Sequence, residues 1–357
     1  MIRTLSILLR KEFIQFRRNK LMPRLAFMFP VMVILIMPLV ANMDVRHVGV
    51  TIIDHDGSTL SRRISATLDA LDFFSVSTAT TYSEAMERVE EGSTDVILTL
   101  PHGLAAGQRT PDIAANGVNG IKGSLGSNYV MQAVISIIAR YHGIQTEGPD
   151  VTFCFNPTLD YRFFMIPALM IMLLIMLCGF MPALNMAGEK ESGTIEQINV
   201  TPVHSFVFVL SKLIPYWILG LVVLTLGMLI AAIVYGLRPA GDIAAIYLAA
   251  FMFSLVMSGI GVIIANFSST MTRSMFLMFF IVMVCVLMSG LFTPIDSMPD
   301  WAQIITYAIP PRYFIDIMRS IYLKGTSIST LAANYIALAA YAAAFGLLAA
   351  LTYRKRS

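Results

Sequence analysis

The polar residues with the greatest potential for chemistry lie in one short stretch, Gly188–Pro202, which reads GEKESGTIEQINVTP. Its three carboxylates are Glu189, Glu191 and Glu196. Paired carboxylates can act as general acid and base in a reaction, but no histidine cluster or metal-ligand pattern accompanies these. The stretch is therefore either a solvated connector or a docking element for a partner protein.

The same stretch predicts a short helix of its own. Gly193 is unfavourable inside a helix, so the preceding helix should end there. Thr194 with Gln197 can cap a new helix, and Pro202 stops regular structure. We expect this short helix to be displaced from the helix before it and to present the three carboxylates to the cytoplasm.

A second polar cluster, Asp54-His55-Asp56, has the residue types of a metal or acid–base site. A strand end followed by Asp-Gly is more often a turn with a helix cap, and the other histidines lack ligand spacing with His55. The sequence contains no nucleophile motif, no zinc-type cysteine spacing and no phosphate-binding loop. We predict no catalytic residue, no metal site and no cofactor bound by this chain.

The amino-acid composition indicates an integral membrane protein. The chain has 357 residues, of which 57% are hydrophobic and 13% charged, whereas about a quarter of the residues of a soluble protein are charged. This excludes purely soluble, disordered and nucleic-acid-binding classes. The predicted fold class is an α-helical integral membrane protein with six transmembrane helices, at 25–42, 161–187, 213–235, 243–265, 274–292 and 331–353.

Charge near the spans predicts their orientation. Basic residues crowd segment 1–24 and the tail 354–357, so both termini should be cytoplasmic. Segment 43–160 has seven Lys and Arg against fourteen Asp and Glu and is expected outside. The loop 188–212 then faces the cytoplasm. No ionisable residue lies centrally in a predicted span, which argues against a proton relay.

Three segments have more specific predictions. Segment 1–24 has apolar residues on one face and arginines on the other, which predicts an interfacial amphipathic helix or a plain topology determinant. Segment 43–160 alternates strand-like and helix-like runs, which predicts a mixed α/β extracytoplasmic domain inserted between the first two spans. Segment 293–330 predicts two short helices around Pro310-Pro311, either a re-entrant helical hairpin or a surface hairpin.

Methionine is frequent in the second and fifth predicted spans. Its pliable side chain suits a surface that accepts varied apolar molecules, although core packing or lipid contact explains it equally well. The candidates for a substrate path are Met172, Met176, Met278 and Met283.

The stretch from Glu189 to Pro202 resembles the E-[RK]-E-x-G-T-x-E-x-[LI]-x-x-[TS]-P signature of type-2 ABC transporter permeases. The N-terminal LLRKEF, the run SGLFTPIDSMPDW at 289–301 and the large insert after the first span also resemble that family, in its multidrug-export branch. Thr293 stands where serine is commoner. The resemblance covers essentially the whole chain.

The resemblance implies a role for each motif. It implies that the loop seats in a cleft of a separate ATP-binding cassette ATPase, which uses ATP and Mg; the coupling residues would be Glu189, Glu191, Gly193, Thr194, Glu196 and Pro202. It also implies an outer gate or re-entrant segment carrying Pro294, Pro299, Trp301, Pro310 and Pro311.

The function implied is that of an export permease in the bacterial inner membrane for an apolar or amphiphilic substrate. Further expected partners are a second permease chain, as homodimer or heterodimer, and a periplasmic adaptor. The alternative is a membrane-anchored sensor or assembly protein whose extracytoplasmic domain binds a ligand or partner.

Overall fold

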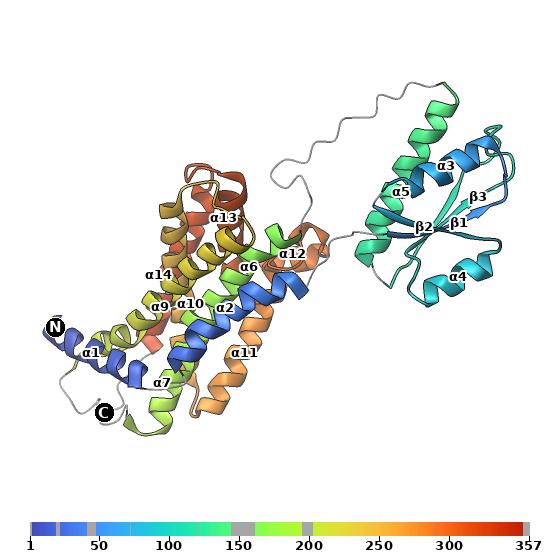
Figure 1. Cartoon of the computed structure of the whole chain (residues 1–357). Coiled ribbons are helices and arrows are strands. Elements are labelled where there is room, and N and C mark those ends of the chain that lie inside the picture. Colours follow the sequence, from blue (N-terminus) through green and yellow to red (C-terminus); the bar gives the residue numbers. More distant parts are fainter. Residues whose placement is uncertain are drawn as a thin grey trace. The chain divides into compact units, whose positions relative to one another are not determined.

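The computed structural model describes residues 2–18, 22–40, 48–71, 73–118, 120–143, 161–194 and 203–352 (Figure 1). The chain divides into two compact units. Residues 1–42 and 160–357 form one, the helical unit, and residues 43–159 form the other, the α/β unit.

The α/β unit is built on a four-stranded sheet of order β2-β1-β3-β4. Strand β1 (Val48–Asp54) lies between β2 (Phe74–Ala79) and β3 (Val96–Leu100) and is parallel to both. Strand β4 (Asp112–Ala115) pairs antiparallel with β3. Because β1 is buried on both faces, its sequence VGVTIID is almost continuously apolar instead of alternating.

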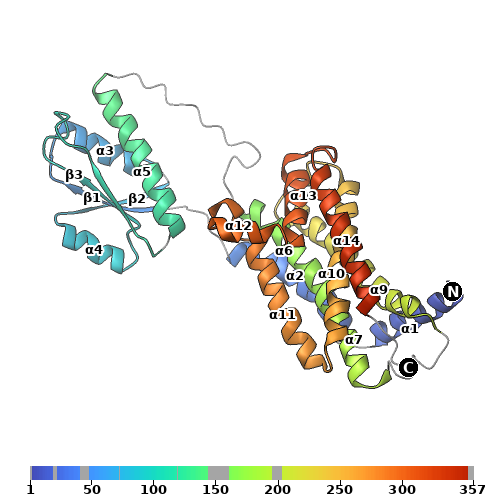
Figure 2. The ribbon, with the colours of Figure 1, turned by 180° about the vertical axis from the view of Figure 1, so that it is seen from behind.

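Helices cover both faces of this sheet. Helices α3 (Thr59–Asp69) and α5 (Gly120–Tyr141) pack on one face, and α4 (Tyr82–Glu90) packs on the other (Figure 1; Figure 2 shows the same layers from behind). The predicted α/β character of this segment is confirmed, whereas its location outside the membrane stays a prediction.

The Asp54-His55-Asp56 cluster is a turn, as the sequence indicated. Asp54 Oδ1 accepts hydrogen bonds from the N–H groups of Asp56 and Gly57, at 2.9 and 3.0 Å. Asp56 Oδ1 accepts from the N–H groups of Gly103 and Leu104. Among the described residues, no group of three or more His, Cys, Asp or Glu is arranged to hold a metal ion.

The helical unit is a bundle that begins with α1 (Ile2–Arg18) and α2 (Met22–Val40). Its remaining elements in chain order are α6 (Tyr161–Ile175), the π-helical η1 (Met176–Phe180), α7 (Met181–Glu191), α9 (Ser205–Val234), α10 (Ile243–Phe267), α11 (Met271–Met288), the 3-10 turn η2 (Ile295–Ser297), α12 (Asp300–Thr306), α13 (Pro310–Lys324) and α14 (Ala332–Thr352).

Five helical runs in the described part of the chain are long and apolar enough to cross a membrane, namely Tyr161–Glu191, Ser205–Val234, Ile243–Phe267, Met271–Met288 and Ala332–Thr352. Helix α2 contributes only a shorter apolar stretch, Phe27–Val40, so the sixth span stays a prediction. Helix α9 starts at Ser205 and therefore contains Lys212, which the sequence had placed in the loop 188–212.

Close backbone approaches hold the centre of the bundle together. Helix α10 contacts η1, α7, α13 and α14. A Cβ on Gly261 of α10 would lie 2.5 Å from the carbonyl oxygen of Gly179, and one on Gly220 of α9 would lie 2.6 Å from Cys178 Sγ. These glycines allow the π-helical turn to fit between α9 and α10. Single π-helical turns inside α-helices are frequent at functional sites.

Candidate functional site

The predicted coupling stretch begins at the end of α7, at the end of the bundle that also carries α1 (Figure 1). Helix α7 ends at Glu191, Ser192 is its C-cap, and Gly193 has a left-handed φ of 73°. Glycine is the usual residue in this conformation after a helix, so the predicted helix end is confirmed. Glu196, Pro202 and the predicted short helix lie outside the described residues.

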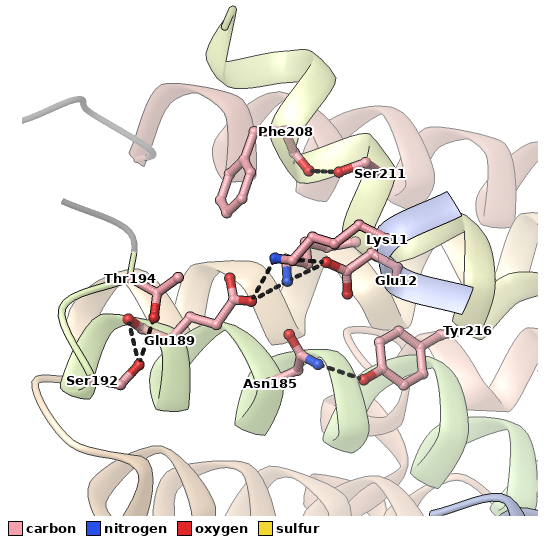
Figure 3. A network of polar contacts seen from close by, with 10 residues as sticks. Lys11, Glu12, Asn185, Glu189, Ser192, Thr194, Phe208, Ser211 and Tyr216 are labelled. Atoms are coloured by element: carbon pink, nitrogen blue, oxygen red, sulfur yellow. Dashed lines mark hydrogen bonds and ion pairs between the residues drawn. The ribbon is translucent and has the colours of Figure 1, made fainter. Parts of the chain in front are cut away.

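Thr194 follows this turn and lies beside the helix end. Its Oγ1 is 3.0 Å from Ser192 Oγ, and Ser192 Oγ also donates to the carbonyl oxygen of Glu189 (Figure 3). These contacts hold Ser192 and Thr194 against the last turn of α7.

Glu189 does not present its side chain to solvent, contrary to the sequence-based expectation. The side chain is only 11% exposed, and its Oε1 accepts a hydrogen bond from Lys212 Nζ of α9 (Figure 3). The expectation was wrong because α9 extends far enough to include Lys212, whose ammonium supplies the cation that a buried carboxylate requires. Glu191 is exposed, as expected.

Lys212 is the centre of a four-residue ionic cluster with Lys11, Glu12 and Glu189. Lys212 Nζ lies 2.7 Å from Glu12 Oε1, and Lys11 Nζ lies 3.3 Å from the same oxygen and 3.6 Å from Glu189 Oε1. The Lys212 side chain is 1% exposed and that of Lys11 43%. The cluster joins α1, α7 and α9 and is formally balanced, with two positive and two negative charges (Figure 3).

The two residues after Glu189 bind two further helices. Lys190 Nζ donates to the carbonyl oxygens of Asn266 and Ser268 at the end of α10, at 2.9 and 2.8 Å. Glu191 Oε2 accepts from the N–H of Met271, the first residue of α11, at 2.7 Å. A cation at a helix C-terminus and an anion at an N-terminus both match the helix dipole.

Three consecutive side chains at the end of α7 are thus bonded to four other helices. We call residues 189–191 the Glu-Lys-Glu hub. A displacement of the chain beyond Gly193 would act first on this hub.

The predicted outer-gate residues lie at the opposite end of the bundle, which we call the hairpin end (Figure 1). Pro294 and Pro299 precede η2 and α12, and Trp301 of α12 is 65% exposed. Pro310 and Pro311 are buried in the first turn of α13. The structure confirms two short helices here, while re-entrance into the membrane stays a prediction.

Sequence reasoning missed Arg319 of α13 at the hairpin end. Its guanidinium donates to the carbonyl oxygens of Gly290 and Leu291, at 2.8 and 2.7 Å, and to that of Phe164 at 3.4 Å. It also stacks on the Phe164 ring, 3.5 Å from the ring centroid. Arg319 therefore joins α13 to the segment after α11 and to the start of α6.

The four methionines proposed for a substrate path do not converge on one cavity. Met278 is fully buried, 2.8 Å from where a Cβ on Gly179 would lie, whereas Met283 is 42% exposed. Met172 and Met176 are half-buried. None of them lines the cavity of about 220 Å³ beside α1 or the cavity of about 560 Å³ between α9, α10 and α14.

Comparison with known proteins agrees with the geometry. Residues 25–351 match the family model described as ABC-2 family transporter protein. The probable multidrug ABC transporter permease YbhR of Escherichia coli K12 is 26% identical over 343 residues, which are 92% of each chain.

Two other Escherichia coli K12 proteins match shorter regions. The probable multidrug ABC transporter permease YbhS is 31% identical over 54% of this chain and 51% of its own length. The inner membrane transport permease YhhJ is 26% identical over 69% of this chain and 68% of its own length. Since the family model covers nearly the whole chain, this multi-pass membrane protein belongs to the ABC-2 transporter family.

Proposed function

We propose that the chain is the permease subunit of an ATP-driven exporter and that a separate ATPase subunit binds it at the end of α7. The observation that carries this proposal is the Glu-Lys-Glu hub, which joins α7 to α1, α9, α10 and α11 immediately before the left-handed turn at Gly193. A partner that binds the following residues would reach most of the bundle through one helix end.

The hub supports coupling on physical grounds. A partner can shift a conformational equilibrium only through contacts that differ between the two states. Residues 193–202 would supply those contacts, with Thr194, Glu196 and Pro202 among them. Residues 189–191 would pass the displacement on, because each side chain is bonded to a different neighbouring segment.

The substrate we propose is an apolar or amphiphilic molecule, such as a drug or a lipid-like compound, that leaves the cytoplasm or the inner leaflet. The cavity of about 560 Å³ supports this class of substrate. Most of its lining residues are either large and apolar, such as Trp217, or small, such as Gly259 and Gly346. Named relatives are described as probable multidrug permeases.

The assembly we propose contains two permease chains, alike or unlike, and an ATPase that uses ATP and Mg, in the bacterial inner membrane. A periplasmic adaptor is a further candidate partner. Both termini would be cytoplasmic, and the α/β unit would lie on the opposite side. The relative YhhJ, described as an inner membrane transport permease, supports this location.

Charge reversal in the loop tests the proposal. Glu196→Lys should reduce both co-purification with the ATPase subunit and permease-dependent ATP hydrolysis, because it inverts a charge where the partner is expected to bind. Glu90→Lys, an exposed reversal in α4 of the α/β unit, is the matched control. Unchanged assembly and hydrolysis in Glu196→Lys would contradict the proposed docking site.

A further inference from the structure

Lys212 is a lysine that the helical unit buries almost completely. Its side chain is 1% exposed, at the eighth position of the 30-residue apolar helix α9. Removing an ammonium from water is costly unless it is paired and hydrogen-bonded. Lys212 meets that condition through two carboxylates from two other helices, Glu12 of α1 and Glu189 of α7.

The three groups are mutually dependent. Glu12 and Glu189 are themselves 8% and 11% exposed, and both oxygens that face Lys212 Nζ are shared with the half-exposed Lys11. The second oxygen of Glu189, Oε2, is buried and accepts no hydrogen bond from any described residue. The position of Glu189, the first residue of the hub, is therefore determined mainly by the buried cation.

We propose that Lys212 is a positioning residue of the coupling machinery, whose buried ammonium holds Glu189 and Glu12 together so that the ends of α1, α7 and α9 move as one body. This proposal rests on the proposed function, because it explains how a displacement at the end of α7 reaches α1 and α9. Lys212 itself touches neither the ATPase nor the substrate in this account.

The chemistry favours such a rigid link over a sliding contact. In a site of low dielectric, ionic interactions are stronger than in water, and an unpaired buried charge is costly. Separating α7 from α9 by even a few ångströms would leave Lys212 with one carboxylate and Glu189 with only Lys11. The cluster therefore resists partial opening.

The test compares four variants of the full chain in complex with its ATPase subunit, reconstituted in lipid nanodiscs. Lys212→Met removes the cation, and Lys212→Arg keeps it. The triple change Glu12→Gln, Glu189→Gln and Lys212→Met removes the link without leaving an uncompensated buried charge, so it should fold even where Lys212→Met does not. Lys324→Met, at an exposed lysine that ends α13, is the control.

The readouts separate positioning from simple stability. One is permease-dependent ATP hydrolysis. The other is the distance distribution, by pulsed electron paramagnetic resonance, between spin labels at Arg3 in α1 and at Ser192, the exposed C-cap of α7, measured without nucleotide and with ATP and vanadate. Cys154, Cys178 and Cys285 are replaced beforehand so that only the labelled sites react.

The proposal predicts a narrow distance that is the same in both nucleotide states for the natural chain, Lys212→Arg and Lys324→Met. The triple variant should give a broadened distance distribution. Its permease-dependent hydrolysis should fall by roughly five-fold or more, with the ATPase still bound. A narrow distance and normal hydrolysis in the triple variant would overturn the proposal, as would a distance in the natural chain that changes with nucleotide. If the natural chain bound no ATPase at all, the proposed function itself would fail instead.

Discussion

A cation joins several helices at each end of the helical unit, but the fully buried Lys212 and the partly buried Arg319 have different partners. At the α7 end, Lys212 bonds to carboxylates on two other helices. At the hairpin end, Arg319 donates to three backbone carbonyl oxygens. Lysine is a compact point charge that suits carboxylates in any direction, whereas the planar fork of arginine matches several acceptors at once.

This difference indicates different tasks for the two ends. The carboxylates that Lys212 binds are side-chain groups of α1 and α7, so the α7 end joins helices that are separate in the chain. The carbonyl groups that Arg319 binds belong to the backbone where α11 ends and α6 begins, so the hairpin end stabilises chain reversals. We therefore expect coupling defects from changes at the α7 end and local structural defects from changes at the hairpin end.

The largest effect should come from Lys212→Met. It leaves Glu12 and Glu189 buried with only the half-exposed Lys11 between them, and breaking a buried ion pair on one side costs about 3–5 kcal/mol. Thermal unfolding of the purified protein in detergent measures the loss. Adding Glu12→Gln should restore part of it, and no recovery in that double variant would show that the lost stability is not electrostatic.

A smaller loss should follow Arg319→Met at the hairpin end. The carbonyl groups of Gly290, Leu291 and Phe164 would lose a charged donor. Because Arg319 is only partly buried, water can replace part of this donor, and the net loss should be about 1.5–3 kcal/mol, the contribution of a single hydrogen bond to a charged group. Arg319→Lys should recover only part of the loss, because lysine lacks the planar fork. Permease-dependent hydrolysis per folded complex should change less than in Lys212→Met; an equal drop would remove the distinction between the two ends.

The smallest effect should come from Glu191→Gln in the hub. Its carboxylate accepts from the first N–H of α11 at an exposed position, and an anion at a helix N-terminus stabilises by about 0.3–1 kcal/mol. The melting temperature should fall slightly, and it should fall less at high salt because the interaction is screened. A loss as large as that of Lys212→Met would mean that Glu191 is buried in the assembled transporter.

The sequence predicted the parts that local patterns determine. Apolar length located the long helices, the strand and helix alternation located the α/β unit, and Gly193 marked the end of α7. It could not predict the ionic cluster, because Glu12 and Lys212 are distant in the chain and a lysine beside an apolar run is typical of a membrane boundary. Arg319 could not be predicted either, because its acceptors are backbone carbonyl groups, which have no sequence signal.

The inward orientation of Glu189 shows what a motif leaves open. The resemblance to the family signature implies that the residues from Glu189 to Pro202 form one coupling element. The structure divides them: the side chains of residues 189–191 are bonded inside the helical unit, and α7 ends before the left-handed turn at Gly193. Contact with the ATPase should therefore be concentrated after this turn.

Site-specific photo-crosslinking would locate the surface that binds the ATPase subunit. A benzoylphenylalanine at Thr194 and, in a separate variant, at the hairpin-end residue Tyr313 would be irradiated in the assembled complex. If the ATPase subunit docks beyond the end of α7, Thr194 should crosslink to it and Tyr313 should not. A crosslink from Tyr313, or none from Thr194 in an intact complex, would contradict this docking site.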